Sequence, residues 1–349
     1  MSLKFKLFCV NVSLLMLSLL NFQPVQAQYN FTELDQKIET VKKELGGAFV
    51  VQIYHKGQVV YNKSEGGFTP KTQAPVASCS KWLTAALILV LADEGKLSLN
   101  DPVSKYLPLY SKYSKGYITI RQCLAHLTGL ESEPIRLATI LKRGKYNSLE
   151  EEVAEFATDK EIVSNPGLEF RYSNIGLNIA GRIAEIVSRK GFEQVMQEKL
   201  LRPLQMRNTS FSSLNAVNPS GGAVSTPNDY MNFMSMLLNK GMFNGRRIMS
   251  ESAVALMHTP QTTTPIIKYA PKAAEGFNYG MGEWIQETDE NGNATVVSCP
   301  GLFGTWPMLD LCRGYASIVF VKSLLTEEKR AVYLDLKKVI DRQIVANCK

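Results

Sequence analysis

Histidine and cysteine are scarce in this 349-residue chain. Its three histidines, His55, His126 and His258, lie far apart in the sequence, and its six cysteines form no C-x-x-C pair. Zinc sites usually draw on clusters of these residues at short spacings. The sequence therefore argues against a metal site, and we expect the protein to need no cofactor.

The cysteines leave their pairing open. Five of the six follow residue 27, an odd number, and no spacing forces a particular disulfide (Cys79, Cys123, Cys299, Cys312 and Cys348). A chain of this length can bury a sizeable core without covalent staples. Disulfides are permitted if the protein is exported.

Long apolar runs are absent except at the N-terminus. Lys4 and Lys6 precede an apolar stretch over 8–20, and Val25-Gln26-Ala27 forms a small-x-Ala cleavage site. This pattern predicts a signal peptide over 1–27, cleaved after Ala27, and a periplasmic or secreted protein. The run is short for a membrane span, and no later run reaches about 18 residues. We therefore expect no membrane span in the mature chain, and an uncleaved N-terminal anchor is the alternative.

Charge of either sign is not concentrated. The formal net charge of +7 falls to +5 once the predicted signal, with two lysines and no acid, is removed. The only compact basic cluster is the run 142–145, which is more typical of a helix end or loop than of a nucleic-acid surface. We expect a small-molecule or peptide substrate and no nucleic acid, and the oligomeric state stays open.

The secondary-structure pattern places strands at both ends of the mature chain and helices between them. Strands are predicted at 48–54 and 58–61, and a three-strand meander at 295–298, 306–311 and 316–321. Helical stripes occupy 32–45 and the C-terminal segment up to about 345. The pattern predicts one α+β domain over 28–349. An antiparallel sheet is built from both ends and flanked by helices, with an all-helical subdomain inserted at about 95–260.

One stretch combines a polar motif with a buried helix. Ser78 and Lys81 form S-x-x-K at the start of an apolar run over 82–92, which ends before Gly95. Spacing of three residues puts both side chains on one face of a helix. A hydroxyl, an amine and the free N–H groups of a helix N-terminus are the parts of an activated serine nucleophile. The motif alone is also compatible with a capping serine followed by a solvated lysine.

A second polar motif, Tyr172-Ser173-Asn174, follows a turn and precedes another apolar helix. Read alone, it is a helix N-terminus with Ser173 or Asn174 as the cap. A loop that presents Tyr172 and Asn174 also suits a cleft. The tyrosine can act as a general base if the Lys81 ammonium lowers its pKa, and the amide can bond a substrate and the lysine at once.

Five ordered segments together resemble the penicillin-recognising serine hydrolases, and within them the class C β-lactamase-related group of β-lactamases, D-peptidases and esterases. The segments span most of the mature chain: 78–85, 126–130, 166–174, 203–211 and 221–229. No G-x-S-x-G motif is present, which argues against an α/β-hydrolase. His126 falls in a motif whose histidine is structural in that family.

The resemblance implies roles for individual residues. Ser78 would be the acyl-forming nucleophile, Lys81 and Tyr172 would share proton transfer, and Asn174 would orient the substrate. The backbone N–H groups of Ser78 and Leu302 would form the oxyanion hole, with Gly301 allowing close approach. Cys299 stands where the family has a lysine or histidine, which weakens the case for β-lactamase and carboxypeptidase activity more than for esterase or amidase activity.

Two hypotheses follow. The first is an exported serine hydrolase that forms an acyl-enzyme on Ser78 and acts on D-amino-acid peptides, β-lactams or small esters. The alternative is a cell-wall-peptide or penicillin-binding protein with little or no turnover. A Ser78→Ala variant distinguishes them.

Overall fold

The computed structural model describes residues 29–132, 134, 143–325 and 327–348, so the predicted signal peptide and its cleavage site lie outside the described residues. Residues 31–349 form one compact unit. No helix among the described residues is long and apolar enough to cross a membrane.

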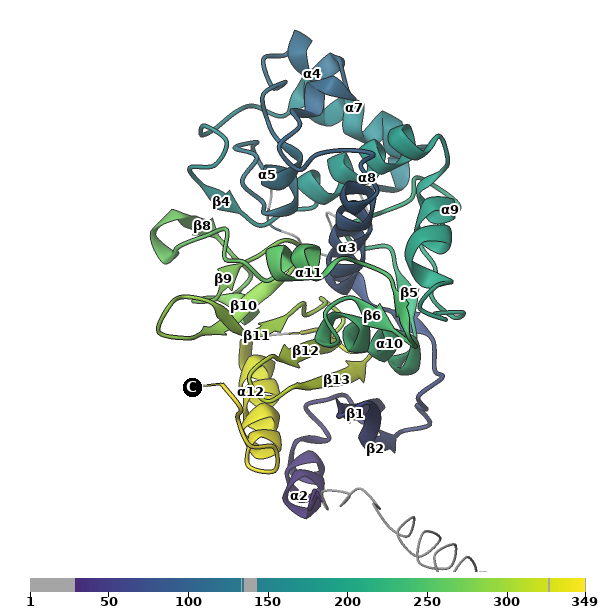
Figure 1. The fold of residues 1–349 in the computed structure, drawn as a ribbon, viewed down its shortest axis with the longest axis vertical. Coiled ribbons are helices and arrows are strands. Elements are labelled where there is room, and N and C mark those ends of the chain that lie inside the picture. The colour runs from purple at the N-terminus through teal and green to yellow at the C-terminus, as the bar shows by residue number, and fades with distance from the viewer. Residues whose placement is uncertain (1–28, 133, 135–142, 326, 349) are drawn as a thin grey trace, which may run out of the picture. The chain divides into compact units, whose positions relative to one another are not determined.

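A seven-stranded antiparallel sheet is the framework of this unit (Figure 1). Its strand order is β2-β1-β13-β12-β11-β10-β9, so β1 from the N-terminal part of the chain lies beside β13 from the C-terminal part. Their bounds are β1 (Phe49–His55), β2 (Gln58–Glu65), β9 (Asn278–Tyr279), β10 (Trp284–Thr288), β11 (Ala294–Ser298), β12 (Trp306–Asp310) and β13 (Tyr315–Val321). Val50 lies opposite Phe320 in the β1–β13 pair.

The central strands are buried on both faces, and the period-two alternation of side chains separates the two sides. All seven residues of β13 are buried, whereas the edge strand β2 is half exposed. Leu309, Ile318 and Phe320 join the main hydrophobic core. Trp306, on the other face, stacks on Tyr333 of a C-terminal helix, with ring centroids 4.7 Å apart.

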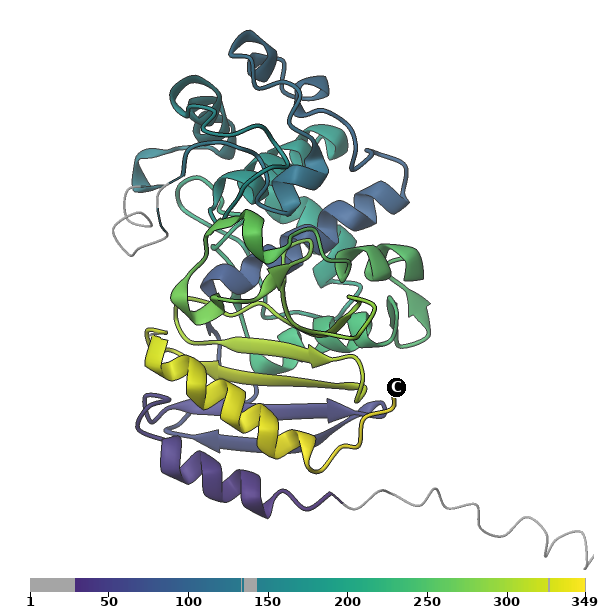
Figure 2. The same cartoon turned by 90° about the vertical axis from the view of Figure 1, so that its left-hand side faces the viewer.

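Helices from the two ends of the unit cover that second face. They are α2 (Thr32–Val41) and α12 (Glu327–Asp341), which pack on each other, and Figure 2 shows α12 crossing the strands. Tyr333 also donates a hydrogen bond to the Gly304 carbonyl. On the core side, α10 (Pro227–Leu238) packs against β1, β12 and β13.

The rest of the unit is mainly helical. Its helices are α3 (Ser80–Asp93), α4 (Leu109–Lys112), α5 (Ile120–Leu124), α7 (Leu149–Asp159), α8 (Ile175–Ser188), α9 (Phe192–Met196) and α11 (Glu251–Met257). Shorter helical turns are η1 (Ala77–Cys79), η2 (Val103–Lys105), η3 (Arg143–Lys145), η4 (Gln197–Leu201), η5 (Thr264–Ile266) and η6 (Lys272–Ala274). In α3 every residue from Ser80 to Leu91 is buried, as expected of a helix that is apolar all round.

The fold class read from the sequence is confirmed, with two refinements. The inserted region carries short strands as well as helices. Inside it β6 (Met242–Phe243) pairs with β7 (Arg246–Arg247), while β5 (Val224–Ser225) and β4 (Phe170–Arg171) pair with strands outside it, β3 (Ala74–Pro75) and β8 (Ile267–Tyr269). Its last long helix, α10, also belongs to the core side of the main sheet.

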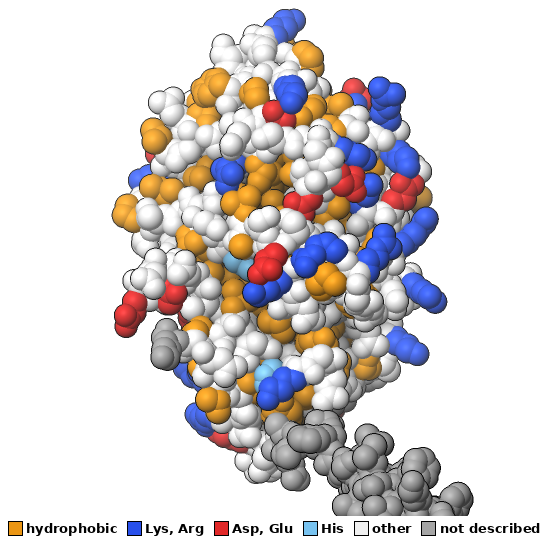
Figure 3. Space-filling model, viewed as in Figure 1, with side chains coloured by type: hydrophobic (Ala, Val, Ile, Leu, Met, Phe, Trp, Pro, Cys, Tyr) orange, Lys and Arg blue, Asp and Glu red, His pale blue; other side chains and the backbone are white. Residues whose placement is uncertain are grey.

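On the face drawn in Figure 3, basic side chains are spread with acidic ones between them.

Candidate active site

Ser78 lies on the short turn η1, immediately before α3, rather than in the first turn of the helix itself. The preceding Ala77 has φ +47°, a left-handed conformation that costs a non-glycine residue about 1–3 kcal/mol. The Ser80 hydroxyl donates to the Ala77 carbonyl at 2.6 Å, and the N–H of Ala223 donates to the same hydroxyl. These bonds hold the turn that carries Ser78.

Lys81 is completely buried, and its ammonium nitrogen faces three oxygens. Nζ lies 3.3 Å from Ser78 Oγ, 3.0 Å from Asn174 Oδ1 and 2.9 Å from the carbonyl oxygen of Ser220. The structure thus brings together the S-x-x-K motif and Asn174. The Ser220 carbonyl was not singled out from the sequence, although the adjoining run from Gly221 was part of the resemblance.

Burial lowers the pKa of Lys81 to about 7, because desolvation disfavours its charged form. Negative charge on Cys299 or Cys79 would oppose this shift, but burial raises the pKa of both thiols, that of Cys299 to about 12. A substantial fraction of Lys81 is therefore a neutral amine near pH 7. A neutral amine beside a serine hydroxyl can accept its proton.

Tyr172 forms a wall of the same site. Its ring centroid lies 4.9 Å from Lys81 Nζ and 5.1 Å from the Trp284 ring. Contrary to the expectation that Lys81 lowers its pKa, burial raises the pKa of Tyr172 well above its ordinary value, and a hydrogen bond with the Ser78 side chain offsets only part of the shift. Tyr172 therefore keeps its proton, and Lys81 is the better base.

His126 supports this wall from behind. Its Nδ1 accepts a hydrogen bond from the Ser173 N–H at 3.4 Å, so Nε2 carries the proton and donates to the Tyr279 hydroxyl at 3.1 Å. Burial keeps the pKa of His126 well below its usual range. Its ring also contacts Tyr172, with centroids 4.6 Å apart. The geometry makes it a neutral packing residue, as the family motif implies.

The segment after β11 runs along the Ser78 turn. The N–H groups of Cys299 and Gly301 donate to β12 and the turn before it, at Pro307 O and Thr305 O. The intervening Pro300 has no N–H to donate. The alternation explains why proline is tolerated there.

Two backbone donors remain open in this region. Among the described residues, neither the Ser78 N–H nor the Leu302 N–H donates to a backbone carbonyl. A Cβ on Gly301 would lie 2.2 Å from the Val76 carbonyl, so the strand end and the Ser78 turn are in van der Waals contact. The two donors needed for an oxyanion hole therefore lie on adjoining segments.

The side chain of Cys299 contacts the backbone of Ser78. Its buried Sγ lies 3.3 Å from the carbonyl oxygens of Ser78 and of Gly282. With a raised pKa, this thiol is neutral and bonded to backbone. No group of three or more histidine, cysteine or acidic side chains suited to a metal occurs among the described residues.

Known proteins resemble this chain in sequence and in fold. The family profile described as Beta-lactamase matches residues 34–340. Protein flp of Staphylococcus aureus (strain MW2) is 32% identical over 197 residues, which is 52% of this chain and 39% of flp. The chain thus spans well under two thirds of that relative.

Two further relatives extend the likeness. The D-alanyl-D-alanine-carboxypeptidase/endopeptidase AmpH of Escherichia coli (strain K12) is 24% identical over 65% of this chain and 64% of its own length. The crystal structure of a candidate beta-lactamase from Bacteroides dorei DSM 17855 matches with a TM-score of 0.80 and 29% identity, covering 90% of this chain and 99% of that one. With the family profile matching most of its length, this chain belongs to the beta-lactamase family.

Proposed function

We propose that this protein is an exported serine hydrolase that forms an acyl-enzyme on Ser78. The family consists of β-lactamase-fold hydrolases. The observation that carries the proposal is the fully buried Lys81, whose pKa is lowered to about 7 and whose nitrogen lies 3.3 Å from Ser78 Oγ. That pair supplies a nucleophile and a base in hydrogen-bond contact, the arrangement that nucleophilic catalysis requires.

In the acylation step, neutral Lys81 takes the Ser78 hydroxyl proton while Oγ bonds to the substrate carbonyl carbon. The carbonyl π electrons move to its oxygen, which the N–H groups of Ser78 and Leu302 stabilise. Such donors are typically worth about 10²–10³-fold in rate each. The tetrahedral intermediate then collapses, its bond to the leaving alcohol or amine breaks, and that group takes a proton.

Tyr172 is the proton donor to the leaving group in this scheme, because its raised pKa keeps the hydroxyl protonated. Lys81, now an ammonium, returns a proton to Tyr172. Deacylation runs the same path in reverse, with water in place of the leaving group. Tyr172 takes the water proton as it passes its own to neutral Lys81, and the Lys81 ammonium returns a proton to Ser78 Oγ as the acyl bond breaks. Asn174, which accepts from Lys81, holds the substrate amide or ester through its N–H₂ group.

The candidate substrates are D-amino-acid peptides, β-lactams and small esters, and Cys299 favours the last. A neutral thiol that bonds the Ser78 and Gly282 carbonyls offers no cation to a substrate carboxylate. Substrates that need such a cation would bind weakly. AmpH is named as a D-alanyl-D-alanine-carboxypeptidase/endopeptidase, and for this reason D-peptides remain among the candidate substrates.

Export is supported by a disulfide. Cys312 and Cys348 are bonded, with Cα atoms 4.9 Å apart, and such bonds persist in oxidising compartments.

The test is hydrolysis of a matched panel by the wild-type protein and by Ser78→Ala. The panel contains p-nitrophenyl butyrate, a D-Ala-D-Ala peptide and a chromogenic cephalosporin. We expect turnover of the ester to exceed that of the peptide, and to vanish in the variant. Turnover that survives in Ser78→Ala would remove Ser78 as the nucleophile. Binding without turnover, unchanged in the variant, would favour a penicillin- or peptide-binding protein instead.

A further inference from the structure

The backbone around Ser220 is bonded to two helices. On the side of α3, the Ser220 carbonyl accepts from Lys81 Nζ at 2.9 Å, and the Thr84 hydroxyl donates to the neighbouring Pro219 carbonyl at 2.6 Å. On the other side, the Ser220 N–H donates to Asn178 Oδ1 of α8 at 3.1 Å. Asn178 is completely buried, so this bond has no competition from water.

A carboxylate behind Asn178 fixes which way its amide faces. Glu152 of α7 accepts from Asn178 Nδ2 at 3.0 Å. An ionised carboxylate can only accept, so Nδ2 must face Glu152 and Oδ1 must face the Ser220 N–H. The charge of Glu152 thus determines the acceptor that the Ser220 N–H meets.

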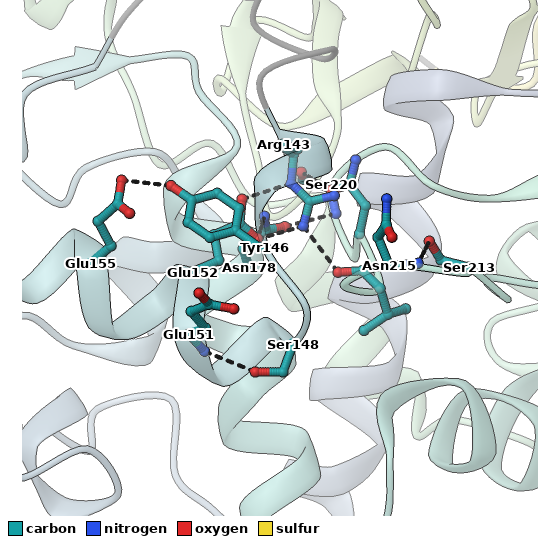
Figure 4. Close-up of polar contacts among 12 residues, drawn as sticks. Arg143, Tyr146, Ser148, Glu151, Glu152, Glu155, Asn178, Ser213, Asn215 and Ser220 are labelled. Atoms are coloured by element: carbon teal, nitrogen blue, oxygen red, sulfur yellow. Dashed lines mark hydrogen bonds and ion pairs between the residues drawn. The ribbon is translucent and has the colours of Figure 1, made fainter.

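Glu152 is in turn paired with Arg143. Arg143 Nε donates to Glu152 Oε1 at 2.6 Å, Nη2 bonds the second carboxylate oxygen, and Nη2 also donates to the Val217 carbonyl at 3.0 Å (Figure 4). The carboxylate side chain is 3% exposed and the guanidinium side chain 14%. The guanidinium therefore holds both the carboxylate and the chain three residues before Ser220.

Burial of this pair needs a reason other than stability. A buried ion pair is often no more stabilising than apolar residues of the same volume, and its retention can reflect a need for one defined geometry. Every polar contact of this pair given above leads to the segment 217–220, either directly or through Asn178.

We propose that Arg143, Glu152 and Asn178 are positioning residues that keep the Ser220 carbonyl on Lys81. The proposal rests on the proposed function, in which Lys81 is the base for Ser78. Without the network, the Ser220 N–H loses its acceptor and the segment 217–220 loses its bond to Arg143, so the Ser220 carbonyl shifts relative to Lys81. The amine then has no fixed direction toward Ser78 Oγ, and a misplacement of about 1 Å can cost up to about 10²-fold in rate.

The direction of the accompanying pKa change follows from the dipole of the carbonyl. Its negative end favours the ammonium form, so its withdrawal lowers the pKa of Lys81 further. The groups that the structure places around Lys81 Nζ are Ser78, Asn174, Ser220 and the Tyr172 ring, with Cys79, Cys299 and His126 close enough to interact electrostatically. None of these side chains changes in the test variants.

The experiment compares Glu152→Gln with Glu155→Gln, a matched control on the same helix. Glu155 binds Lys145 and the Tyr146 hydroxyl, each at 2.7 Å, so it ties the end of η3 to α7 without reaching Ser220. Figure 4 shows its bond to Tyr146. Steady-state rates with p-nitrophenyl butyrate are measured from pH 5 to 9 and normalised to active sites. Crystal structures of both variants give the Lys81–Ser220 distance without relying on activity.

For Glu152→Gln we expect kcat to fall about tenfold with KM changed less than twofold, and the acid limb of the kcat profile to move to lower pH. The control should match the wild type. An unmoved acid limb, together with a Lys81–Ser220 distance unchanged from 2.9 Å, would overturn the proposal.

Two outcomes call for a second measurement: a variant that does not fold, and a wild-type protein without turnover. If Glu152→Gln does not fold, Arg143→Gln removes the same ion pair from its more exposed end and is judged by the same criteria. If the wild-type protein turns over none of the ester, the peptide and the cephalosporin, the proposed function fails, and the distance in the crystal structures alone decides whether the network positions Ser220.

Discussion

The Lys81 side chain is 0% exposed, so its ammonium form has no hydration shell. Its three oxygen partners are all uncharged, being a hydroxyl, a side-chain amide and a backbone carbonyl, and they replace water only in part. The balance leaves the pKa of Lys81 at about 7, low for a lysine and suited to a base that works at neutral pH. Tyr172, buried beside it, is shifted the opposite way and stays protonated.

The pH dependence of catalysis follows from these two shifts. Below the pKa of Lys81, about 7, the amine is protonated and cannot accept the Ser78 proton, so kcat/KM should fall about tenfold per pH unit. Above it, the rate should level off, since Tyr172 does not ionise in this range. A kcat/KM profile from pH 5 to 9, corrected with the Ser78→Ala background, measures this. A rate independent of pH between 5 and 8 would contradict the role of Lys81.

Among the structural elements, the end of β11 and the turn η1 make the tightest approach at the site. A methyl group at Gly301 would lie 2.2 Å from the Val76 carbonyl and 3.1 Å from Cys79 Sγ. Backbone must move to accommodate it. Leu302, the next residue, carries one of the two proposed oxyanion donors, so any movement displaces it.

Gly301→Ala should therefore destabilise the protein by about 1–3 kcal/mol, as overpacking does, and lower kcat more than it raises KM. Gly191→Ala is the matched control, because no atom lies within 4 Å of its added methyl group. Chemical denaturation and ester kinetics measure both effects. Equal stability and equal kcat of the two variants would show that the strand end accommodates a methyl group at Gly301.

The sequence predicted those elements whose residues carry a periodic or compositional signal. The apolar pattern indicated β1 and the three C-terminal strands. The family resemblance predicted that Ser78, Lys81 and Asn174 share one site, and hydrogen bonds join them there. Helix ends were less exact: α2 ends at Val41 rather than near Leu45.

The remaining features depend on contacts that no local pattern encodes. The Ser220 carbonyl acts through its backbone, so its side chain gives no signal. The pKa of Tyr172 depends on how completely it is buried, and the expectation that Lys81 lowers it ignored desolvation. Glu152 and Asn178 are 26 residues apart, and each alone reads as an ordinary helix residue.

At the scale of the whole molecule, one covalent bond ties the C-terminal segment to the sheet. The Cys312–Cys348 disulfide closes a separation of 36 residues, which contains β13 and α12. The Asn347 N–H also donates to the Cys312 carbonyl at 2.9 Å. The helix that covers one face of the sheet is thereby anchored after its last turn, far from Ser78 in the sequence.

Loss of this bond should lower stability and leave catalysis intact. The double variant Cys312→Ser/Cys348→Ser should be less stable than the oxidised protein by about 2–4 kcal/mol, with kcat/KM within twofold. Urea denaturation with and without reductant provides the measurement. Reductant should lower the free energy of unfolding of the wild type and leave that of the double variant unchanged. A wild type whose free energy of unfolding does not change with reductant would show that the bond contributes nothing to stability.

The proposed function depends on Ser78 acting as an acyl-forming nucleophile. Its most direct test is the intact mass of the wild-type protein and of Ser78→Ala after incubation with a reactive penicillin and with an activated short-chain ester, followed by peptide mapping. We predict an acyl adduct on the wild type alone, trapped or seen transiently before turnover, and mapped to Ser78. An adduct on another residue, or turnover of either compound with equal rates in both proteins, would contradict the account.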